Sequence, residues 1–486
     1  MPRAWGNAQL KTALHWFRRD LRIVDNTALL EARRAGETLV PVFIVEDSFR
    51  TGRDVGGGRV SFLMRSLDSL AKNLEALGYK LIVRSGRSET VIPELAKETG
   101  AQAVFANNRY EPYAQARDRK VRENLRGIGV DLRIFKDAVM WEEKEILTKT
   151  AAPYTVFTPY SKTWRTKPTS KPLAKLVAAK PVNPPVRSEP IPLDPAVLGH
   201  PTTQDLWPAG EKAAREALDG FLANAVFKYS DGRNFPAEPG TSRLSPHLRA
   251  GTIGIRTVVQ KVDSLRTSAD PVQLRSLDTY VSELIWREFY LQILHNFPHV
   301  MRGSFRPEYD ALEWSQNRDH LQAWKAGQTG FPIVDAAMRC LNKTGWMHNR
   351  LRMIVAMFLT KDLLVSWREG EQYFMQQLVD GDTAANNGGW QWSAGTGTDA
   401  APYFRIFNPV TQAEKFDPDG VFVKQWVPEL RDVPSDLVHQ PWENPLVLSR
   451  SKYAGRIVLH DVQRARCLAM YQKVKGKAAA PSRAAD

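Results

Sequence analysis

The sequence predicts an α/β fold class, in which an N-terminal Rossmann-like domain with a five-stranded parallel sheet precedes a linker and a large all-α domain. Three observations predict this order. Apolar runs alternate with amphipathic stretches over the first 140 residues, eight prolines fall between Pro168 and Pro195, and helical spacing dominates after Glu211. The predicted units span residues 1–140, 141–210 and 211–474, with a flexible tail at 475–486.

The alternation in the N-terminal unit is typical of βαβ repeats. Parallel strands need crossover connections, and right-handed crossovers place helices on both faces of the sheet. The predicted strands are 13–17, 39–45, 80–83, 103–106 and 131–135, and the predicted helices are 26–35, 60–77, 90–97 and 114–125. The turn after the first strand, Arg18-Arg19-Asp20-Leu21-Arg22, lacks the G-x-G-x-x-G motif, which disfavours an ordinary NAD dehydrogenase.

The prolines of the next segment resist helix formation and favour extended chain, which predicts the linker. The C-terminal half has helical spacing. The predicted helices there are 213–222, 255–262, 279–295, 320–325, 333–341, 350–364 and 371–378.

The composition favours a globular protein that binds a polyanion. The 486 residues hold 67 Lys and Arg against 53 Asp and Glu, a net charge of +14, which favours nucleic acid as a partner, although a bland basic surface is an alternative. Cys340 and Cys467 are the only thiols, too few for a disulfide framework and without metal-ligand spacing. With no signal peptide or long apolar run, we expect a cytoplasmic protein without a membrane span or a metal.

Three segments carry candidate binding residues. On the helix at 279–295, Glu283, Trp286, Arg287 and Tyr290 share one face, either as ligand contacts or as an exposed ion pair beside core aromatics. In 345–353, Asn349, Met353 and Arg350 suit recognition of a flat polar ring, or Asn349 caps a helix whose arginines are solvated. Residues 241–246 suit phosphate binding or a plain N-cap.

The densest signal is Asp380-Gly381-Asp382-Thr383-Ala384-Ala385-Asn386-Asn387-Gly388-Gly389-Trp390-Gln391-Trp392. Its three glycines and its polar side chains are interpreted as a non-helical segment that lets a ligand approach the backbone, with two tryptophans as stacking surfaces. The wider group of tryptophans in the helical half is either core filling or functional.

These motifs resemble those of the photolyase and cryptochrome flavoproteins. The resemblance is carried by the text around Trp286, by G-F-P-I-V-D-A-A-M-R at 330–339, by G-W-M-H-N-R at 345–350 and by the stretch 380–392, and it runs from His15 to beyond Trp426. The sequence looks most like the class I cyclobutane pyrimidine dimer DNA photolyases. The resemblance therefore implies a carbon–carbon lyase that uses blue light and electron transfer to repair UV-damaged DNA.

The resemblance implies that the all-α domain binds FAD, reduced in the active state. The implied cofactor residues are Tyr229, Thr241, Ser242, Arg243, Leu244, Ser245, Arg352, Asp380, Gly381, Asp382 and Asn386, with Arg352 paired to Asp380 and Asn386 facing flavin N5. The implied residues for the flipped-out dimer and its DNA are Glu283, Trp286, Arg287, Tyr290, Asn349, Arg350, Met353, Trp392 and Gln412. Glu283 and Asn386 are implied to be catalytic, and Trp390, Trp367 and Trp314 match the tryptophan chain that photoreduces oxidised flavin.

The resemblance also implies a second, light-harvesting antenna chromophore in the N-terminal domain. Folate-binding members carry an Asn-Glu pair where this chain has Tyr113 and Ala114, so the antenna is unassigned among deazaflavin, folate and flavin. A monomer without an obligate protein partner is expected. A (6-4) photolyase is disfavoured by Asn349, and a signalling photoreceptor and a basic nucleic-acid binder with a vestigial flavin site are the competing functions.

Overall fold

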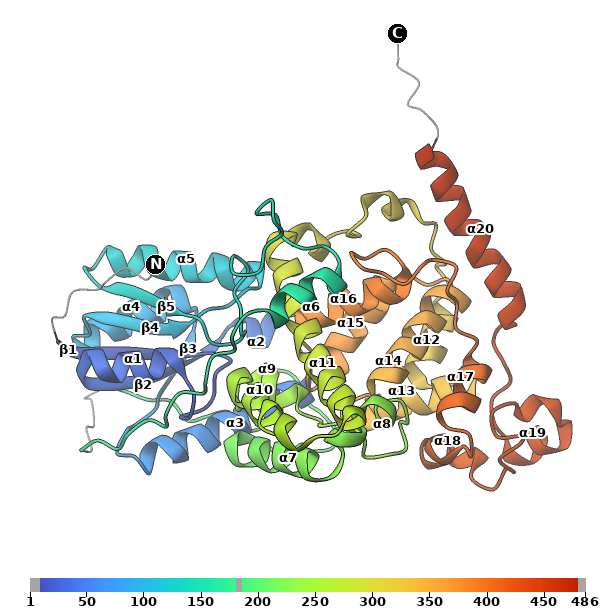
Figure 1. Ribbon diagram of the computed structural model, residues 1–486, viewed down its shortest axis with the longest axis horizontal. Coiled ribbons are helices and arrows are strands. Elements are labelled where there is room, and N and C mark those ends of the chain that lie inside the picture. The colour runs from blue at the N-terminus through green and yellow to red at the C-terminus, as the bar shows by residue number, and fades with distance from the viewer. Residues whose placement is uncertain (1–8, 181–185, 480–486) are drawn as a thin grey trace, which may run out of the picture.

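Five parallel strands form the N-terminal sheet, in the order β3-β2-β1-β4-β5 (Figure 1). The computed structural model describes residues 9–180 and 186–479. The strands are β1 (Leu10–Phe17), β2 (Gly36–Glu46), β3 (Ile82–Gly86), β4 (Ala103–Asn107) and β5 (Asp131–Phe135). The predicted parallel sheet is confirmed, although β3 begins two residues later than expected.

Helices cover both faces of this sheet. The helices are α1 (Thr27–Ala35), the four-residue α2 (Ser48–Thr51), α3 (Gly57–Glu75), α4 (Ser88–Thr99) and α5 (Pro112–Arg126). Side chains of α4 and α5 fill one apolar core with the strands, and side chains of α1 and α3 fill the other. The sequence predicted all of these helices except α2, which has no buried residue and hence no apolar pattern.

The connection between the domains is not wholly extended. Helix α6 (Phe157–Arg165) lies inside the predicted linker and packs against the helical domain through Tyr160 and Trp164. Residues 181–185 of the linker lie outside the described residues.

The C-terminal domain is helical, as predicted, and lies beside one end of the sheet domain (Figure 1). Its helices are α7 (Gly210–Asn224), α8 (Tyr229–Gly232), α9 (Ser245–Ala250), α10 (Ile255–Asp263), α11 (Pro271–Asn296), α12 (Arg318–Ala326), α13 (Pro332–Thr344), α14 (Asn349–Met357), α15 (Trp367–Gln377), α16 (Thr383–Ala394), α17 (Pro409–Phe416), α18 (Val421–Trp426), α19 (Pro445–Ser451) and α20 (His460–Ala479).

Two expected boundaries in this domain were wrong. The single helix predicted at 350–364 ends at Met357 and continues as a π-helical turn over Phe358–Asp362, where the buried Lys361 donates to the Ala394 carbonyl at 2.7 Å. The predicted tail begins inside α20, which runs to Ala479, and residues 480–486 lie outside the described residues. No helix in the described part of the chain combines the length and apolar composition needed to cross a bilayer.

Buried ion pairs join the two domains. Arg256 of α10 contacts Asp25 at 2.7 Å and Asp137 at 2.9 Å, and Arg22 contacts Asp137 at 2.6 Å. Burying a charge is costly unless a partner compensates it, so these mutual contacts fix the α10 side of the helical domain against the carboxyl ends of the strands.

Candidate active site

The segment 380–392 is a helix for most of its length, so its interpretation as non-helical was wrong. Helix α16 begins at Thr383 because Asp382 caps it: its Oδ1 accepts from the backbone N–H groups of Ala384 at 3.1 Å and Ala385 at 3.2 Å. Capping by Asp stabilises a helix by about 1 kcal/mol, which offsets much of the cost of two helical glycines.

The glycines of α16 permit a close helix contact. A Cβ added to Gly388 would lie 2.1 Å from Cδ1 of Tyr290, so the absence of a side chain lets the α11 ring pack against the α16 backbone. Gly389 is different, because a Cβ there would meet nothing within 4 Å. Asp382, the N-cap of α16, stands at i to Asn386 at i+4 and Gly389 at i+7, so the three residues share one face.

Asp380 precedes that face in the chain, and only one of its two carboxylate oxygens has a hydrogen-bond partner among the described residues. Arg352 donates to its Oδ2 at 2.8 Å, which is the predicted ion pair. Asp380 Oδ1 is buried and has no hydrogen-bond partner among the described residues. The amide of Asn386 donates through Nδ2 to the Glu371 carbonyl at 2.9 Å, which leaves its Oδ1 to accept from a ligand N–H.

Residues 241–245 lead into α9 and lie against two tyrosines. The hydroxyl of Tyr280 donates to Ser242 Oγ at 3.1 Å, and its ring meets Tyr229 edge-on with centroids 5.1 Å apart. Arg243 adopts a left-handed φ of 49° and places its guanidinium 5.1 Å from the Trp346 ring centroid. Tyr280 was not recognised from the sequence, where it looks like an ordinary buried position of α11.

Glu283 has a charged partner that the sequence did not reveal. Arg233 donates to Glu283 Oε1 at 2.6 Å, and both side chains are partly exposed. Arg233 follows α8, fifty positions earlier in the chain, so no local spacing pattern links the two residues. The contact orients the carboxylate of Glu283 at the surface of α11.

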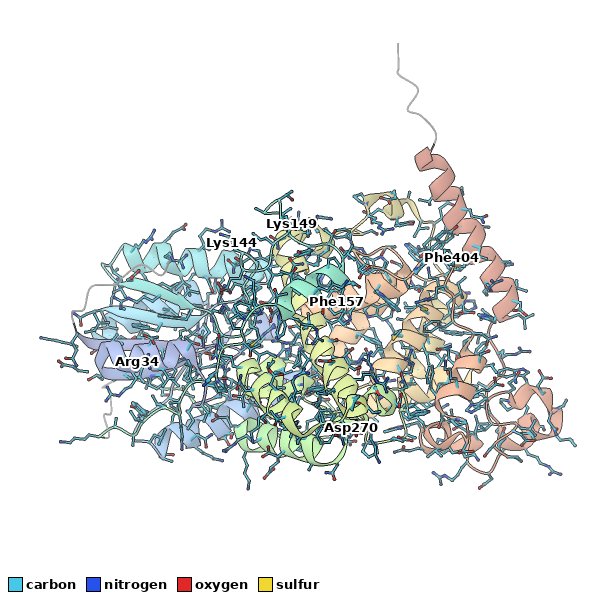
Figure 2. All side chains as sticks on the ribbon, in the orientation of Figure 1. Arg34, Lys144, Lys149, Phe157, Asp270 and Phe404 are labelled. Atoms are coloured by element: carbon cyan, nitrogen blue, oxygen red, sulfur yellow. The ribbon has the colours of Figure 1, made fainter. Side chains whose placement is uncertain are left out.

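The Trp286 ring stacks in parallel on an aromatic residue of the predicted linker. Phe157 stacks on it with ring centroids 3.7 Å apart and planes within 5°, and Figure 2 labels Phe157 in the centre of the molecule. The Phe157 N–H donates to Asp399 Oδ2 at 3.0 Å, and the hydroxyl of Thr398 donates to the Thr155 carbonyl at 2.6 Å. The start of α6 thus bridges Trp286 and the loop after α16.

That loop borders a small recess of about 10 Å³. The recess brings together Tyr290, the Gly388 backbone and Trp392 with Thr398 and Asp399. Two aromatic rings and a few polar groups thus border a space of about the size of one water molecule.

Helix α14 begins at a different cap from the one expected, so the alternative in which Asn349 caps this helix was wrong. His348, not Asn349, caps it by accepting the Arg350 N–H at 3.2 Å, and burial lowers the pKa of His348 to about 3. A neutral imidazole is the form that can accept this bond. Asn349 is left exposed, with its amide free of the capping role.

Arg350 lies between this helix and α17. It donates to Asn234 at 2.5 Å, and its guanidinium lies 4.3 Å from the Phe416 ring centroid and 4.0 Å from the sulfur of Met353. Gln412 is on the same helix as Phe416.

Arg287 does not join the other residues of its helix face. It donates to the Ala138 carbonyl at 2.8 Å and lines a second small recess of about 10 Å³ with Arg19 and Arg22 at the domain boundary. The face shared by Glu283, Trp286, Arg287 and Tyr290 in the sequence is therefore divided between the domain boundary and the surroundings of the recess.

Two of the three tryptophans of the implied electron path are buried, and the third lies at the edge of the same core. Trp390 and Trp367 are buried in the largest helical core, and Trp314 packs on its edge. A Cβ added to Gly370 would lie 2.1 Å from Cη2 of Trp390, so Gly370 makes room for that ring. Trp324, which the sequence did not single out, lies 6.0 Å from Trp390 between ring centroids.

Comparisons with known proteins agree with this geometry. The family model described as DNA photolyase matches residues 13–181, and the model described as the FAD binding domain of DNA photolyase matches residues 280–473. A deoxyribodipyrimidine photo-lyase of Agrobacterium fabrum is 39% identical over 483 residues, with 96% of this chain and 99% of the relative covered. The chain belongs to the DNA photolyase family.

Two solved photolyase structures have the same fold as this photolyase chain. A class III photolyase from Agrobacterium tumefaciens superposes with a TM-score of 0.89 at 39% identity, covering 98% of this chain and 100% of that one. An archaeal photolyase from Sulfolobus tokodaii, solved with two FAD molecules, has a TM-score of 0.83 at 32% identity over 95% of this chain and 100% of that one. The family and the fold predicted from the sequence are confirmed.

Proposed function

We propose that this chain is a light-driven DNA repair enzyme, a deoxyribodipyrimidine photo-lyase that splits cyclobutane pyrimidine dimers. One observation carries the proposal: a single helix, α16, supplies the face shared by Asp382, Asn386 and Gly389, the buried Trp390, and Trp392 at the recess. A cofactor face, an electron path and a substrate wall on one rigid element suit a reaction that moves an electron between cofactor and substrate.

The residues present fit FAD. The buried, unpartnered Oδ1 of Asp380 calls for a ligand N–H or hydroxyl, and no heavy atom lies within 4 Å of the position that a Cβ of Gly389 would take, so a ligand could approach the backbone there. Asp380 and Asn386 would hold the ring, and Thr241, Ser242, Arg243, Leu244 and Ser245 with Tyr229 would hold the phosphates and the rest of the cofactor. Reduced FAD, when bound and excited by blue or near-UV light, supplies the electron that splits the dimer.

The chain's own residues would bind and stabilise the damaged bases. Trp286 and Trp392 would wall a dimer that is flipped out of the duplex, as photolyases are known to do. Glu283, oriented by Arg233, and the exposed amide of Asn349 would hydrogen-bond the fused bases. The Asn349 amide can donate to a base carbonyl and the Glu283 carboxylate can accept from a base N–H, so both contacts can form before charge develops on the dimer.

Other residues would contact the DNA and replace electrons. Arg350 and Gln412, with Met353 alongside, would meet the strand around the lesion, and Tyr290 would contribute from α11. Trp390, Trp367 and Trp314 would carry electrons from the surface to an oxidised flavin, because indole rings oxidise readily and all three lie in or against one core.

We also propose a second chromophore in the N-terminal domain. The archaeal photolyase with two FAD molecules supports a flavin in that role, beside deazaflavin and folate. A monomer in the cytoplasm, close to the nucleoid in a prokaryote, is proposed on the family resemblance alone.

The test is repair of a thymine dimer in a defined oligonucleotide by the dithionite-reduced protein, with and without blue light. We expect reversal only in the light. Glu283→Ala should lower repair per absorbed photon more than it lowers FAD content, and equal repair by that variant would remove its assigned role. Failure of the wild-type protein to repair, despite bound reduced FAD, would point instead to a (6-4) substrate or to signalling.

A further inference from the structure

A group of arginines lies behind the 380–382 loop, on the side of the N-terminal domain. We name Arg19, Arg59, Arg109 and Arg249 the interdomain arginine cluster. Three of them come from the N-terminal domain, and Arg249 comes from α9. Arg19 contacts Glu111 at 2.8 Å and Asp382 at 3.5 Å, so it joins the two domains by charge.

The cluster touches the loop itself. Arg249 Nε donates to the Gly381 carbonyl at 2.8 Å, and Arg59 Nη1 donates to the Leu378 carbonyl at 3.0 Å. A Cβ added to Gly381 would lie 2.3 Å from that same Arg59 nitrogen. A glycine at 381 therefore lets a guanidinium reach the backbone between the two acidic residues.

The positive charge of the cluster exceeds the negative charge that contacts it. Glu111 pairs with Arg109 as well as with Arg19, and Asp380 pairs with Arg352. Among the described residues, neither Arg59 nor Arg249 forms an ion pair with a carboxylate, since the contacts of both are backbone carbonyls.

The arginines also perturb one another. Burial, followed by the neighbouring Arg19, lowers the pKa of Arg59 to about 10, and the charges of Asp380, Asp54 and Asp382 offset only part of this shift. Burial together with Arg19 and Arg59 holds the pKa of Arg249 well below its usual range. Like charges gathered away from water are unfavourable unless an anion compensates them.

The loop that these arginines contact carries Asp380 and leads into the face of Asn386. On the proposed function, on which this inference rests, that face meets a flavin that works as a reduced anion. We propose that the interdomain arginine cluster stabilises the reduced anionic flavin from behind the loop, so that the N-terminal domain raises the flavin's reduction potential. Arg19, Arg59 and Arg249 act as positioning residues, because they reach the cofactor through the loop and through Asp382.

The direction in which the cluster shifts the reduction potential of FAD can be tested with two substitutions at the contact between Arg19 and Glu111. Arg19→Gln removes a positive charge and should lower the midpoint potential of bound FAD in the full-length holoenzyme. Glu111→Gln removes the carboxylate that neutralises Arg19 and Arg109 and should raise it. We expect each change to alter the ratio of oxidised to reduced FAD by about tenfold at a fixed solution potential, which is about 30 mV for a two-electron couple.

Two further variants are controls. Arg34→Gln removes a positive charge from the exposed pair with Glu31 on α1, at the outer end of the same domain, and should leave the potential unchanged (Figure 2). Arg19→Lys keeps the charge and should retain most of the wild-type potential. The potentials are measured by spectroelectrochemical titration of the flavin absorbance, and the thermal midpoint of each holoenzyme is recorded beside it.

Shifts of opposite sign for Arg19→Gln and Glu111→Gln support the proposal. Shifts of the same sign, or a changed thermal midpoint with an unchanged potential, overturn it, because a merely structural contact would behave in that way. If the Arg19→Gln variant does not retain FAD, the proposal is still tested by the rise in midpoint potential expected for Glu111→Gln and by the potential of Arg19→Lys. The outcome is separate from the proposed function, since wild-type protein that binds FAD and repairs DNA with insensitive potentials would refute this inference alone.

Discussion

Two adjacent glycines of α16 give a sharp test of where the flavin lies. Gly388 and Gly389 are neighbours on one helix and have the same helical backbone. The two positions differ in the atoms that a side chain would contact. A methyl group at 388 would enter the Tyr290 ring at 2.1 Å, whereas one at 389 would meet nothing within 4 Å. Substitution by alanine should therefore have opposite effects on the stability of the FAD-free protein.

The magnitudes follow from packing and helix propensity. Alanine is favoured over glycine inside a helix by about 0.5–1 kcal/mol, and this gain is the same at both positions. Overpacking costs about 1–3 kcal/mol, and only Gly388→Ala incurs it. We expect Gly389→Ala to raise the unfolding free energy of the helical domain by about 0.5–1 kcal/mol and Gly388→Ala to lower it by about 1–2 kcal/mol, measured by urea unfolding with circular dichroism.

Binding of FAD should reverse the advantage of Gly389→Ala. Its methyl group would occupy the open space beside Asn386, where the flavin is proposed to lie, so we expect FAD affinity to fall by about tenfold, or about 1.4 kcal/mol. The assay is fluorescence titration of the FAD-free proteins. Wild-type affinity in Gly389→Ala would place the flavin elsewhere, and wild-type stability in Gly388→Ala would refute the contact between α11 and α16.

Three other properties can be predicted. Trp367→Phe should abolish photoreduction of oxidised FAD but leave repair by chemically reduced enzyme near normal, and loss of both would show that the two reactions are not separable. Binding to dimer-containing DNA should weaken between 50 and 200 mM salt by roughly tenfold for every two phosphate contacts, and a flat dependence would argue against the DNA partner. Burial raises the pKa of Glu288 to about 7, so the folded state holds this proton more tightly than the unfolded chain. The stability from Glu288 is thus present below about pH 4.5 and lost as the pH rises through 7, by about 3 kcal/mol in total; Glu288→Gln should remove this slope in unfolding measured from pH 5 to 8.

The sequence predicted the layers of the fold because those layers depend on local periodicity. Each strand of the parallel sheet is a short apolar run, and α3, α4 and α5 have amphipathic patterns that end near caps or glycines. Their boundaries differ from the predicted ones by a few residues only. The ion pair of Arg352 with Asp380 was also predicted, through the family resemblance and not through spacing.

What the sequence did not predict depends on contacts between distant segments. Helix α6 docks on α11 through its Trp164 indole, which donates to Glu288, and Glu288 also accepts hydrogen bonds from the Met140 and Trp141 N–H groups that precede α6. Arg233 meets Glu283 only after α8 and α11 pack together. A residue pattern read along one segment contains no information on such partners.

The net charge of +14 is a second property whose meaning depends on contacts that the sequence does not show, because it does not tell where each basic residue acts. Several arginines lie inside the protein, where Arg18 faces Asp118, Arg22 faces Asp137 and Arg256 faces Asp25. The net charge of each of these Arg–Asp pairs is zero. The pairs therefore leave unchanged the net positive charge that could attract the phosphates of DNA. The buried Arg59, which has no carboxylate partner among the described residues, does belong to the excess. Composition alone would assign its charge to DNA binding, whereas its position behind Gly381 assigns it to the flavin, so Arg59 should contribute to the reduction potential and not to the salt dependence of DNA binding.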